Sequence, residues 1–199
     1  MTSFNLRELE KKAYLSYHQD GLLETGIGLY IFIFAIGMHY DIVGYLTDIL
    51  PILGFGVLAA AKKIITIPRI GVVKFGPERK LRMKKEHLFF AVFFSITVFF
   101  GVFMFLAFNR MTPGVEAILK KFIMAPMGFL LGLGLAFVGF WRQLSRFYGY
   151  GILLIAIVFI GPLLGIEPPI YWGAGGLIIS LFGLGHLVYF LIQNPRPKE

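Results

Sequence analysis

Residues 170–192 read IYWGAGGLIISLFGLGHLVYFLI, and no Asp, Glu, Lys or Arg interrupts them. A helix needs about 20 apolar residues to cross the hydrocarbon core of a bilayer, and this stretch meets that requirement. Its bulky residues suit contact with lipid, whereas its glycines suit close contact with other helices. The stretch therefore predicts a transmembrane helix and indicates the class of fold for the rest of the chain.

Five further apolar runs precede this stretch. They cover residues 22–39, 42–61, 88–108, 122–140 and 150–166. The last of these runs is short and contains Gly161-Pro162, so a re-entrant or partly broken helix is an alternative there. We predict an all-α, polytopic integral membrane helix bundle with six transmembrane helices.

The composition supports a membrane protein and argues against other classes. Hydrophobic residues make up 57% of the chain and charged residues 15%, whereas soluble domains have about a quarter charged residues. The net charge is +8, and the basic residues lie in short connections between the apolar runs. In this position they indicate membrane topology and contact with anionic lipid rather than nucleic-acid binding. Cysteine is absent, which excludes disulfides and thiolate metal sites. We find no enzyme motif and expect no cofactor.

Lysine and arginine are distributed unequally between the two sides of the predicted bundle. With a cytoplasmic N-terminus, sixteen of the 19 basic residues lie in cytoplasmic segments, and the exceptions are Arg110, Lys120 and Lys121. Positive charge concentrates on the cytoplasmic side of membrane proteins. We therefore expect both termini in the cytoplasm and a multi-pass protein of the cell membrane. Trp141 and Trp172 fall near predicted span ends, where aromatic residues commonly act as interface anchors.

Three regions follow from these boundaries. Residues 1–21 are expected to form an amphipathic helix on the cytoplasmic surface, residues 22–192 the transmembrane domain, and residues 193–199 a cytoplasmic tail. A basic cytoplasmic loop, residues 62–87, interrupts the transmembrane domain. Its first half is rich in β-branched residues and leads to a Gly-Pro turn, which predicts either a small β-hairpin or an irregular loop.

Three ionisable residues in the predicted spans form a candidate intramembrane polar site: Glu24, Asp48 and His186. A charge at a helix centre costs about 2.5–3.5 kcal/mol on insertion scales, so such residues need a partner or a function. One interpretation is a hydrogen-bonded pair of Glu24 with His186, since the two residues lie at similar depth. The interpretation that we favour is that Glu24 reaches the interface while His186 bonds a neighbouring carbonyl group. Asp48 either caps a helix that begins at the next residue or lines a pathway.

The segment Tyr17-His-Gln-Asp-Gly21 holds the densest set of polar groups before the first span. Its acidic side chains suit the positive end of that helix, which predicts a junction between the surface helix and the membrane. A metal site is the alternative, but Asp20 and Glu24 share a helix face that His18 does not share. We therefore predict no metal site.

Five basic residues cluster at the end of the predicted loop: Arg79, Lys80, Arg82, Lys84 and Lys85. Each basic residue near a membrane surface attracts anionic headgroups by about 1 kcal/mol. The cluster therefore predicts a surface for anionic lipid or a partner, although a plain topology signal would have the same appearance.

The combination of Tyr-His-Gln-Asp-Gly at 17–21 with Pro-Arg-Ile-Gly-Val-Val-Lys-Phe at 68–75 resembles small, uncharacterised polytopic membrane proteins of prokaryotes. The resemblance covers roughly residues 1–80. It marks His18, Asp20 and Arg69 as a candidate junction motif, and it implies no activity.

Two classes of function fit these features. The first is a non-enzymatic membrane component that binds anionic lipid or a membrane protein partner. The second is a small oligomeric transporter or channel whose pathway contains the candidate intramembrane polar site. Gly128, Gly132 and Ala136 form a stripe of small residues that serves either packing within the bundle or contact between two copies. Because polar residues within the spans are few, we expect the first class.

Overall fold

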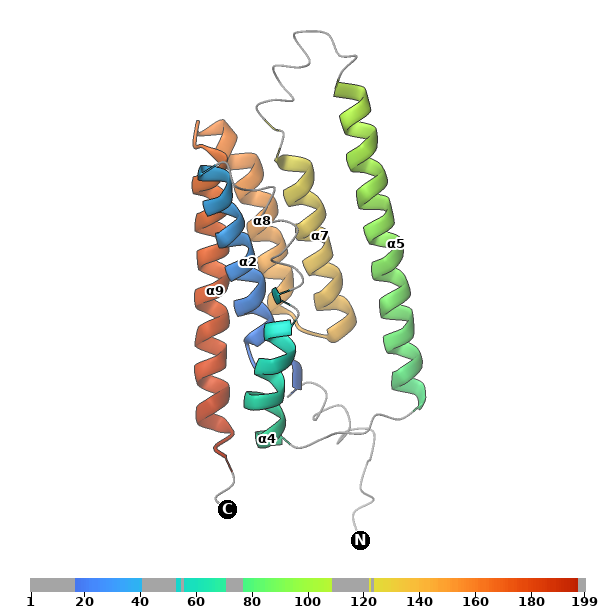
Figure 1. Ribbon diagram of the computed structural model, residues 1–199, viewed down its shortest axis with the longest axis vertical. Coiled ribbons are helices and arrows are strands. Elements are labelled where there is room, and N and C mark those ends of the chain that lie inside the picture. The colour runs from blue at the N-terminus through green and yellow to red at the C-terminus, as the bar shows by residue number, and fades with distance from the viewer. Residues whose placement is uncertain are drawn as a thin grey trace.

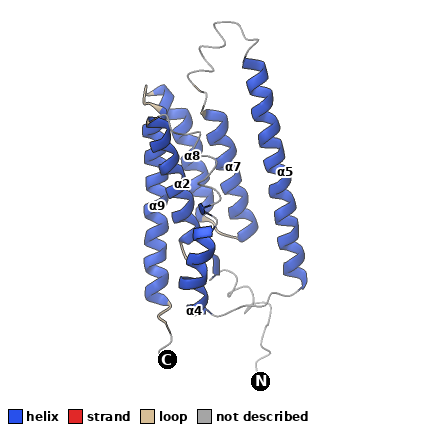
Figure 2. Cartoon of the chain, in the orientation of Figure 1, coloured by secondary structure: helices blue, strands red, loops and turns tan. Residues whose placement is uncertain are grey.

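The computed structural model describes residues 17–40, 53–54, 56–70, 77–108, 122 and 124–196. Within the helix that begins at Pro77, the described side chains are those of residues 84–89, 91–93, 95–99 and 101–103. Every regular element in this part of the chain is a helix, and no strand occurs in it (Figure 2). The expected all-α class is confirmed.

Five of the helices are long and apolar enough to cross a membrane. They are α2 (Leu22–His39), α5 (Pro77–Phe108), α7 (Ala125–Arg142), α8 (Arg146–Leu163) and α9 (Pro168–Gln193). A short π-helix, η1 (Lys62–Thr66), continues directly into α4 (Ile67–Ile70). The length and composition of the five long helices are those of a helical membrane protein.

These helices agree closely with the predicted apolar runs. α2 covers residues 22–39 as predicted, and the bounds of α7, α8 and α9 differ from the predicted ones by no more than four residues. α5 ends at Phe108 as predicted but begins at Pro77, because its first turns are basic rather than apolar. α8 is continuous over 18 residues with Pro162 in its last turn, so the broken helix is wrong.

α2 and α9 run antiparallel and pack backbone against backbone. A Cβ atom at Gly28 would lie 2.3 Å from the amide nitrogen of Ser180, and one at Gly176 would lie 2.5 Å from that of Phe32. No larger side chain fits at either glycine without moving a helix. Small residues allow this close approach, and they fix how the two helices are aligned.

α7 and α8 form a second antiparallel pair, joined by a tight turn in which Gln143 has a φ of 58°. A Cβ atom at Gly132 would lie 2.7 Å from the carbonyl oxygen of Gly151, and one at Gly128 would meet the side chain of Val158. The predicted stripe of small residues therefore serves packing within the bundle.

The hydrophobic core lies between these four helices. Phe147 and Leu154 of α8 and Ile179 of α9 are fully buried in it. Trp172 is also 0% exposed, and its ring contacts Phe34 edge-on with centroids 6.2 Å apart. The expectation that Trp172 acts as an interface anchor is therefore wrong, since it is a core residue that happens to lie near a helix end.

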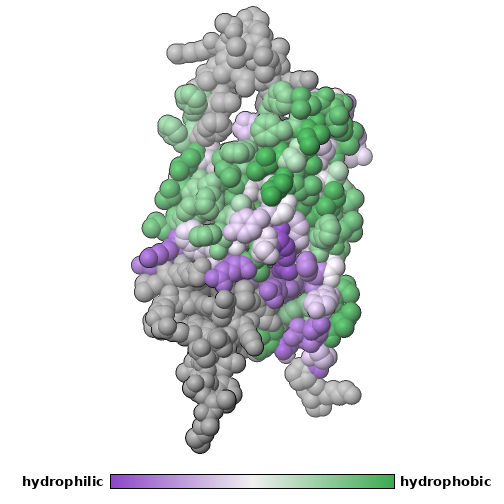
Figure 3. Space-filling model, turned by 180° about the vertical axis from the view of Figure 1, so that it is seen from behind, coloured by the Kyte–Doolittle hydropathy of each residue, from purple (hydrophilic) through white to green (hydrophobic). Residues whose placement is uncertain are grey.

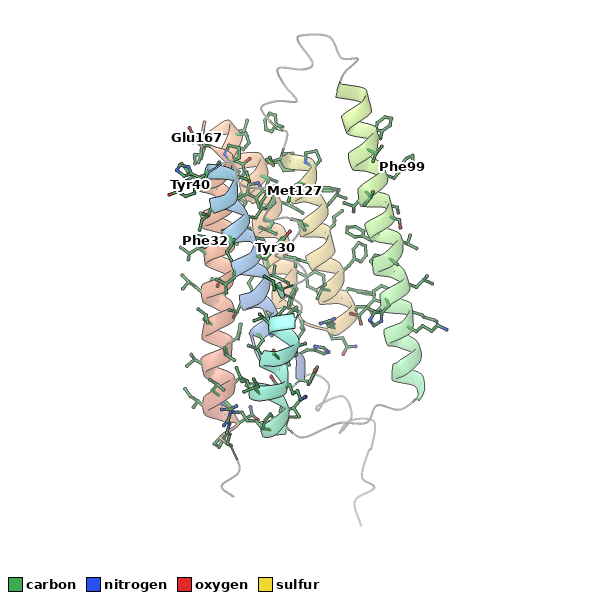
Figure 4. All side chains as sticks on the ribbon, viewed as in Figure 1. Tyr30, Phe32, Tyr40, Phe99, Met127 and Glu167 are labelled. Carbon is green, nitrogen blue, oxygen red and sulfur yellow. The ribbon has the colours of Figure 1, made fainter. Side chains whose placement is uncertain are left out.

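α5 stands apart from this core and contacts α7 through aromatic rings. The ring of Phe89 stacks on Trp141 with centroids 5.1 Å apart and lies 4.6 Å from that of Phe137. Farther along α5, Phe99 points away from the other helices and is 76% exposed (Figure 4). The described ring contacts thus attach α5 to α7 through the turns that directly follow the basic start of α5.

The basic ends of α4, α5, α7 and α8 lie together with the start of α2 and the end of α9 (Figure 1). α2, α5 and α8 begin, and α4, α7 and α9 end, at the lower end of the bundle in Figure 1. We call this the basic end. Tyr40 and Glu167 lie at the opposite end (Figure 4). On the face that Figure 3 shows, the hydrophilic residues gather in the lower half of the coloured surface, whereas its upper half is mostly hydrophobic.

The β-hairpin expected within residues 64–84 is wrong for the described part of that stretch. Residues 62–70 are helical, and α5 already begins at Pro77. β-branched residues favour strands only weakly, and a helix that continues from residue 61 overrides that preference. Residues 1–16, which contain most of the predicted surface helix, and residues 41–52 and 71–76 lie outside the described residues. The predicted span at residues 42–61 is the one without a counterpart among the five long helices. It is described only at residues 53–54 and 56–61, where it is helical.

Candidate functional site at the basic end

Asp20 joins the segment before α2 to the π-helix. Its Oδ1 atom accepts a hydrogen bond from the Leu22 amide at 3.2 Å, which satisfies one free donor at the start of α2. Its Oδ2 atom accepts a hydrogen bond from the Thr66 hydroxyl at 2.7 Å. Both Asp20 and Thr66 are 0% exposed. Asp20 therefore binds the start of α2 with one oxygen, next to the N-cap residue Gly21, while its other oxygen connects two segments distant in sequence.

Lys62 completes this connection. Its Nζ atom lies 3.2 Å from Asp20 Oδ2, donates a hydrogen bond to the Tyr17 carbonyl oxygen at 2.9 Å, and lies 4.2 Å from the centre of the Tyr17 ring. Burial lowers the pKa of the Lys62 ammonium from its usual value, and the neighbouring Asp20 carboxylate opposes that effect. The ammonium is held by a carboxylate, a carbonyl and an aromatic face, which together replace its water.

The π-helical turn explains two further contacts at this place. A π-turn disturbs the regular pairing of backbone groups, and its carbonyl groups become available to other donors. The carbonyl oxygen of Ile65 accepts a hydrogen bond from Arg69 at 2.7 Å, and that of Ile64 accepts one from Arg196 at 3.2 Å. The segment after α9 is thereby attached to the same turn that binds Asp20.

Glu24 and Arg146 form an ion pair between α2 and α8. Glu24 is 0% exposed, and Arg146 Nε lies against Glu24 Oε1. A second guanidinium nitrogen of Arg146 donates a hydrogen bond to the carbonyl oxygen of His18 at 3.1 Å. The pair neutralises a charge near the start of a membrane-length helix, where an isolated carboxylate would be costly. We call Asp20, Glu24, Lys62, Thr66 and Arg146 the buried charge cluster.

The turn between α7 and α8 binds helices on both of its sides. Arg146 follows the turn and pairs with α2, whereas Arg142 precedes it and pairs with Glu86 of α5 at 3.0 Å. Glu86 is 5% exposed. One short connection thus ties α5 and α2 to the same hairpin through opposite charges.

A second set of charges at the basic end faces outward. Lys63, Lys84, Lys85 and Arg196 are exposed, and we call them the exposed cationic surface. Three of the four acidic side chains that the structure describes, Asp20, Glu24 and Glu86, are buried and paired with cations at this end. The fourth, Glu167, lies at the opposite end (Figure 4). Among the described side chains, the exposed charge of the basic end is therefore positive.

The structure separates the residues of the predicted intramembrane polar site. The Glu24 carboxylate is fully buried and faces Arg146, so it neither pairs with His186 nor reaches the interface as expected. His186 instead lines a groove on the outer face of α9, together with Gly185 and Tyr189. Asp48 lies outside the described residues, so its two interpretations stay open. The carboxyl–imidazole pair fails because a stronger partner, a guanidinium, reaches Glu24 from α8.

The predicted junction motif is brought together in part. Asp20 lies in the buried charge cluster, and the carbonyl group of His18 contacts it through Arg146. Arg69 binds one turn farther along, on the carbonyl group of Ile65. Of the predicted basic cluster, Lys84 and Lys85 are exposed, while the side chains of Arg79, Lys80 and Arg82 lie outside the described ones.

The sequence does not indicate the partners of the acids. Lys62 and Thr66 fall in the predicted loop, and Arg142 and Arg146 fall among the basic residues that indicate topology. Lys62 and Thr66 are four residues apart, which places them on one helix face and was the available signal. Arg142 and Arg146 lie on either side of the turn between α7 and α8, so their spacing carries no such signal. Nothing local indicates which distant acid each of the four residues binds.

The chemistry of this arrangement is that of ion pairing. No group of three or more His, Asp or Glu side chains that could hold a metal ion occurs among the described residues. Comparisons of this chain with protein-family models, with curated proteins and with solved structures found no match. Its function must therefore be inferred from the geometry and charge of the basic end.

Proposed function

We propose that the protein is a non-enzymatic, multi-pass component of the cell membrane, with six spans and both termini in the cytoplasm, that binds anionic lipid headgroups at its basic end. The observation that carries this proposal is the separation of charge there. The described acids of the basic end are buried against Lys62, Arg142 and Arg146, so no described acid compensates the exposed cationic surface. Cations placed at the end of a membrane helix bundle lie at the level of the headgroups.

The expected strength of this interaction follows from the number of cations. Each basic residue near an anionic surface contributes about 1 kcal/mol, and tenfold in affinity corresponds to about 1.4 kcal/mol. Removal of three charges should therefore weaken lipid binding by about a hundredfold. The interaction should also weaken as salt is raised, because the exposed charges are screened within about 10 Å at 0.1 M salt.

Native mass spectrometry of the detergent-purified protein tests the proposal, with phosphatidylglycerol and phosphatidylcholine as probes. We expect tighter binding of phosphatidylglycerol, and loss of that preference when Lys63, Lys84 and Lys85 are changed to Gln. The matched control changes the same three residues to Arg and should keep the preference. Equal binding of the two lipids by the wild-type protein, or an unchanged preference in the Gln variant, would reject the proposal.

A small transporter or channel is a second candidate, favoured by one observation. Glu24 and Arg146 are opposite charges placed inside the bundle, and ionisable residues at such places commonly mark transport pathways. Uptake of a solute or ion by proteoliposomes, abolished in Glu24→Gln while the variant remains folded, would make transport the primary function.

A further inference from the structure

The outer face of α9 carries a groove near the basic end. It has a volume of about 540 Å³ and is lined by Leu181, Phe182, Gly185, His186 and Tyr189. A side chain at Gly185 would meet no other atom within 4 Å, so the floor of the groove is open. Leu181, Phe182 and Tyr189 are each more than half exposed and form its walls. An apolar groove of this size can hold part of a hydrocarbon chain.

The groove ends at the depth where headgroups begin. α9 has 26 residues, and at 1.5 Å per residue it is about 39 Å long, whereas the hydrocarbon core is about 30 Å thick. Part of the helix therefore extends beyond the hydrocarbon, and the polar residues Gln193 and Asn194 suit its C-terminal end to the headgroup layer. The Tyr189 hydroxyl lies there and accepts a hydrogen bond from Gln193 at 2.9 Å, as expected for a tyrosine at the interface.

Cations lie beyond the same end of the groove. Arg196 follows the last turn of α9, is exposed, and uses one guanidinium nitrogen to bind the carbonyl oxygen of Ile64. A guanidinium has five N–H donors, so others are available to a phosphate group. Lys63, adjacent in sequence to Ile64, is also exposed. The apolar groove thus leads toward a positive site, which matches a ligand with a hydrocarbon chain and an anionic head.

We infer that the groove on α9 is a specific site for one anionic phospholipid, with an acyl chain against Gly185 and the phosphate at Arg196 and Lys63. This inference rests on the proposed function, because it assigns a defined place to a lipid that the exposed cationic surface attracts. The half-buried imidazole of His186 forms a polar margin of the groove, from which it can donate a hydrogen bond to an ester oxygen of the lipid.

Gly185→Leu tests the groove with little risk to the fold, because the new side chain enters open space. Gly149→Leu in α8 is the matched control, since Gly149 is also an exposed helical glycine with no atom within 4 Å of a Cβ. The dissociation constant of the first phosphatidylglycerol bound is measured by native mass spectrometry for both variants. We expect Gly185→Leu to weaken it by about tenfold, as expected from the loss of a few buried methylene contacts. Gly149→Leu should leave it unchanged within about twofold.

The other outcomes separate the groove from the proposed function. If both glycine variants bind phosphatidylglycerol like the wild type, while neutralising Lys63, Lys84 and Lys85 still abolishes the preference, the groove is wrong and the proposed function stands. If Gly185→Leu instead changes the oligomeric mass, the groove is a contact between two copies and the inference is overturned. If the wild type shows no preference for phosphatidylglycerol over phosphatidylcholine, the proposed function fails, and the groove fails with it.

Discussion

Lys62 and Lys63 are neighbours in the chain but belong to two different regions of the basic end. Lys62 belongs to the buried charge cluster, where its side chain is 15% exposed and holds Asp20 and Tyr17. Lys63 belongs to the exposed cationic surface. The difference shows that the cations at this end of the bundle fall into two groups, one buried against acids and one exposed. Cations that face the acids form buried ion pairs, and the cations that face outward are those to which we assign the binding of anionic lipid.

The largest effect should follow from removing Arg146. In Arg146→Met the carboxylate of Glu24 stays buried without its partner, and breaking a buried pair costs about 3–5 kcal/mol. The free energy of unfolding, measured by titration with sodium dodecyl sulfate, should fall by that amount. Replacing both partners, as in Glu24→Gln with Arg146→Met, should recover much of the loss. A single variant as stable as the wild type would show that the pair does not stabilise the fold.

A smaller effect is expected from Lys62, and Lys63 provides its control. Lys62→Met removes one cation from Asp20, but Thr66 and the Leu22 amide still bind that carboxylate. Hydrogen bonds to charged groups contribute about 1.5–3 kcal/mol, so we expect a loss of about 2 kcal/mol. Lys63→Met should change the free energy of unfolding by less than about 0.5 kcal/mol. Equal losses in the two variants would break the distinction between the two regions.

Thr66 contributes a single hydrogen bond to the buried charge cluster. Thr66→Val keeps the shape of the side chain but removes the hydroxyl that donates to Asp20, which should cost about 1.5 kcal/mol. Thr66→Ser keeps the hydroxyl and serves as the control, with a smaller loss from the missing methyl group. The same detergent titration measures both variants. If Val were tolerated better than Ser, the hydrogen bond would be unimportant for stability.

The exposed cationic surface should affect stability least. Changing Lys63, Lys84 and Lys85 to Gln removes no described contact with an acid, so the free energy of unfolding by urea in an uncharged detergent should stay within about 0.5 kcal/mol per residue. Circular dichroism during the urea titration would detect a larger loss. Such a loss would mean that these lysines support the fold rather than a binding surface.

The helices could be predicted well from sequence, because each span must be apolar over a length that the bilayer dictates. α2 has the predicted bounds for this reason. α5 begins earlier than predicted, because its first turns are basic. Helix formation in these turns depends on the helix propensity of the residues, and the apolar pattern gives no information about it. The strand preference of residues 64–75 was likewise overridden where the chain is described, at residues 64–70.

The site was predicted in part. Glu24, Asp20 and His18 were recognised because polar residues at a span boundary require an explanation. Their partners were not, because Thr66 and Arg146 are far away in sequence and nothing local indicates which acid each will bind. The pairing depends on the antiparallel packing of α2 with α9 and of α7 with α8, which glycine contacts determine at the level of the backbone.

The most direct test of the central claim is the thermal unfolding midpoint in lipid nanodiscs of phosphatidylcholine with and without phosphatidylglycerol. A ligand that binds the folded state raises the midpoint. We predict that phosphatidylglycerol raises the midpoint of the wild-type protein but not that of the variant with Gln at Lys63, Lys84 and Lys85. An equal rise in both proteins, or no rise in the wild type, would contradict the assignment of the exposed cationic surface to anionic lipid.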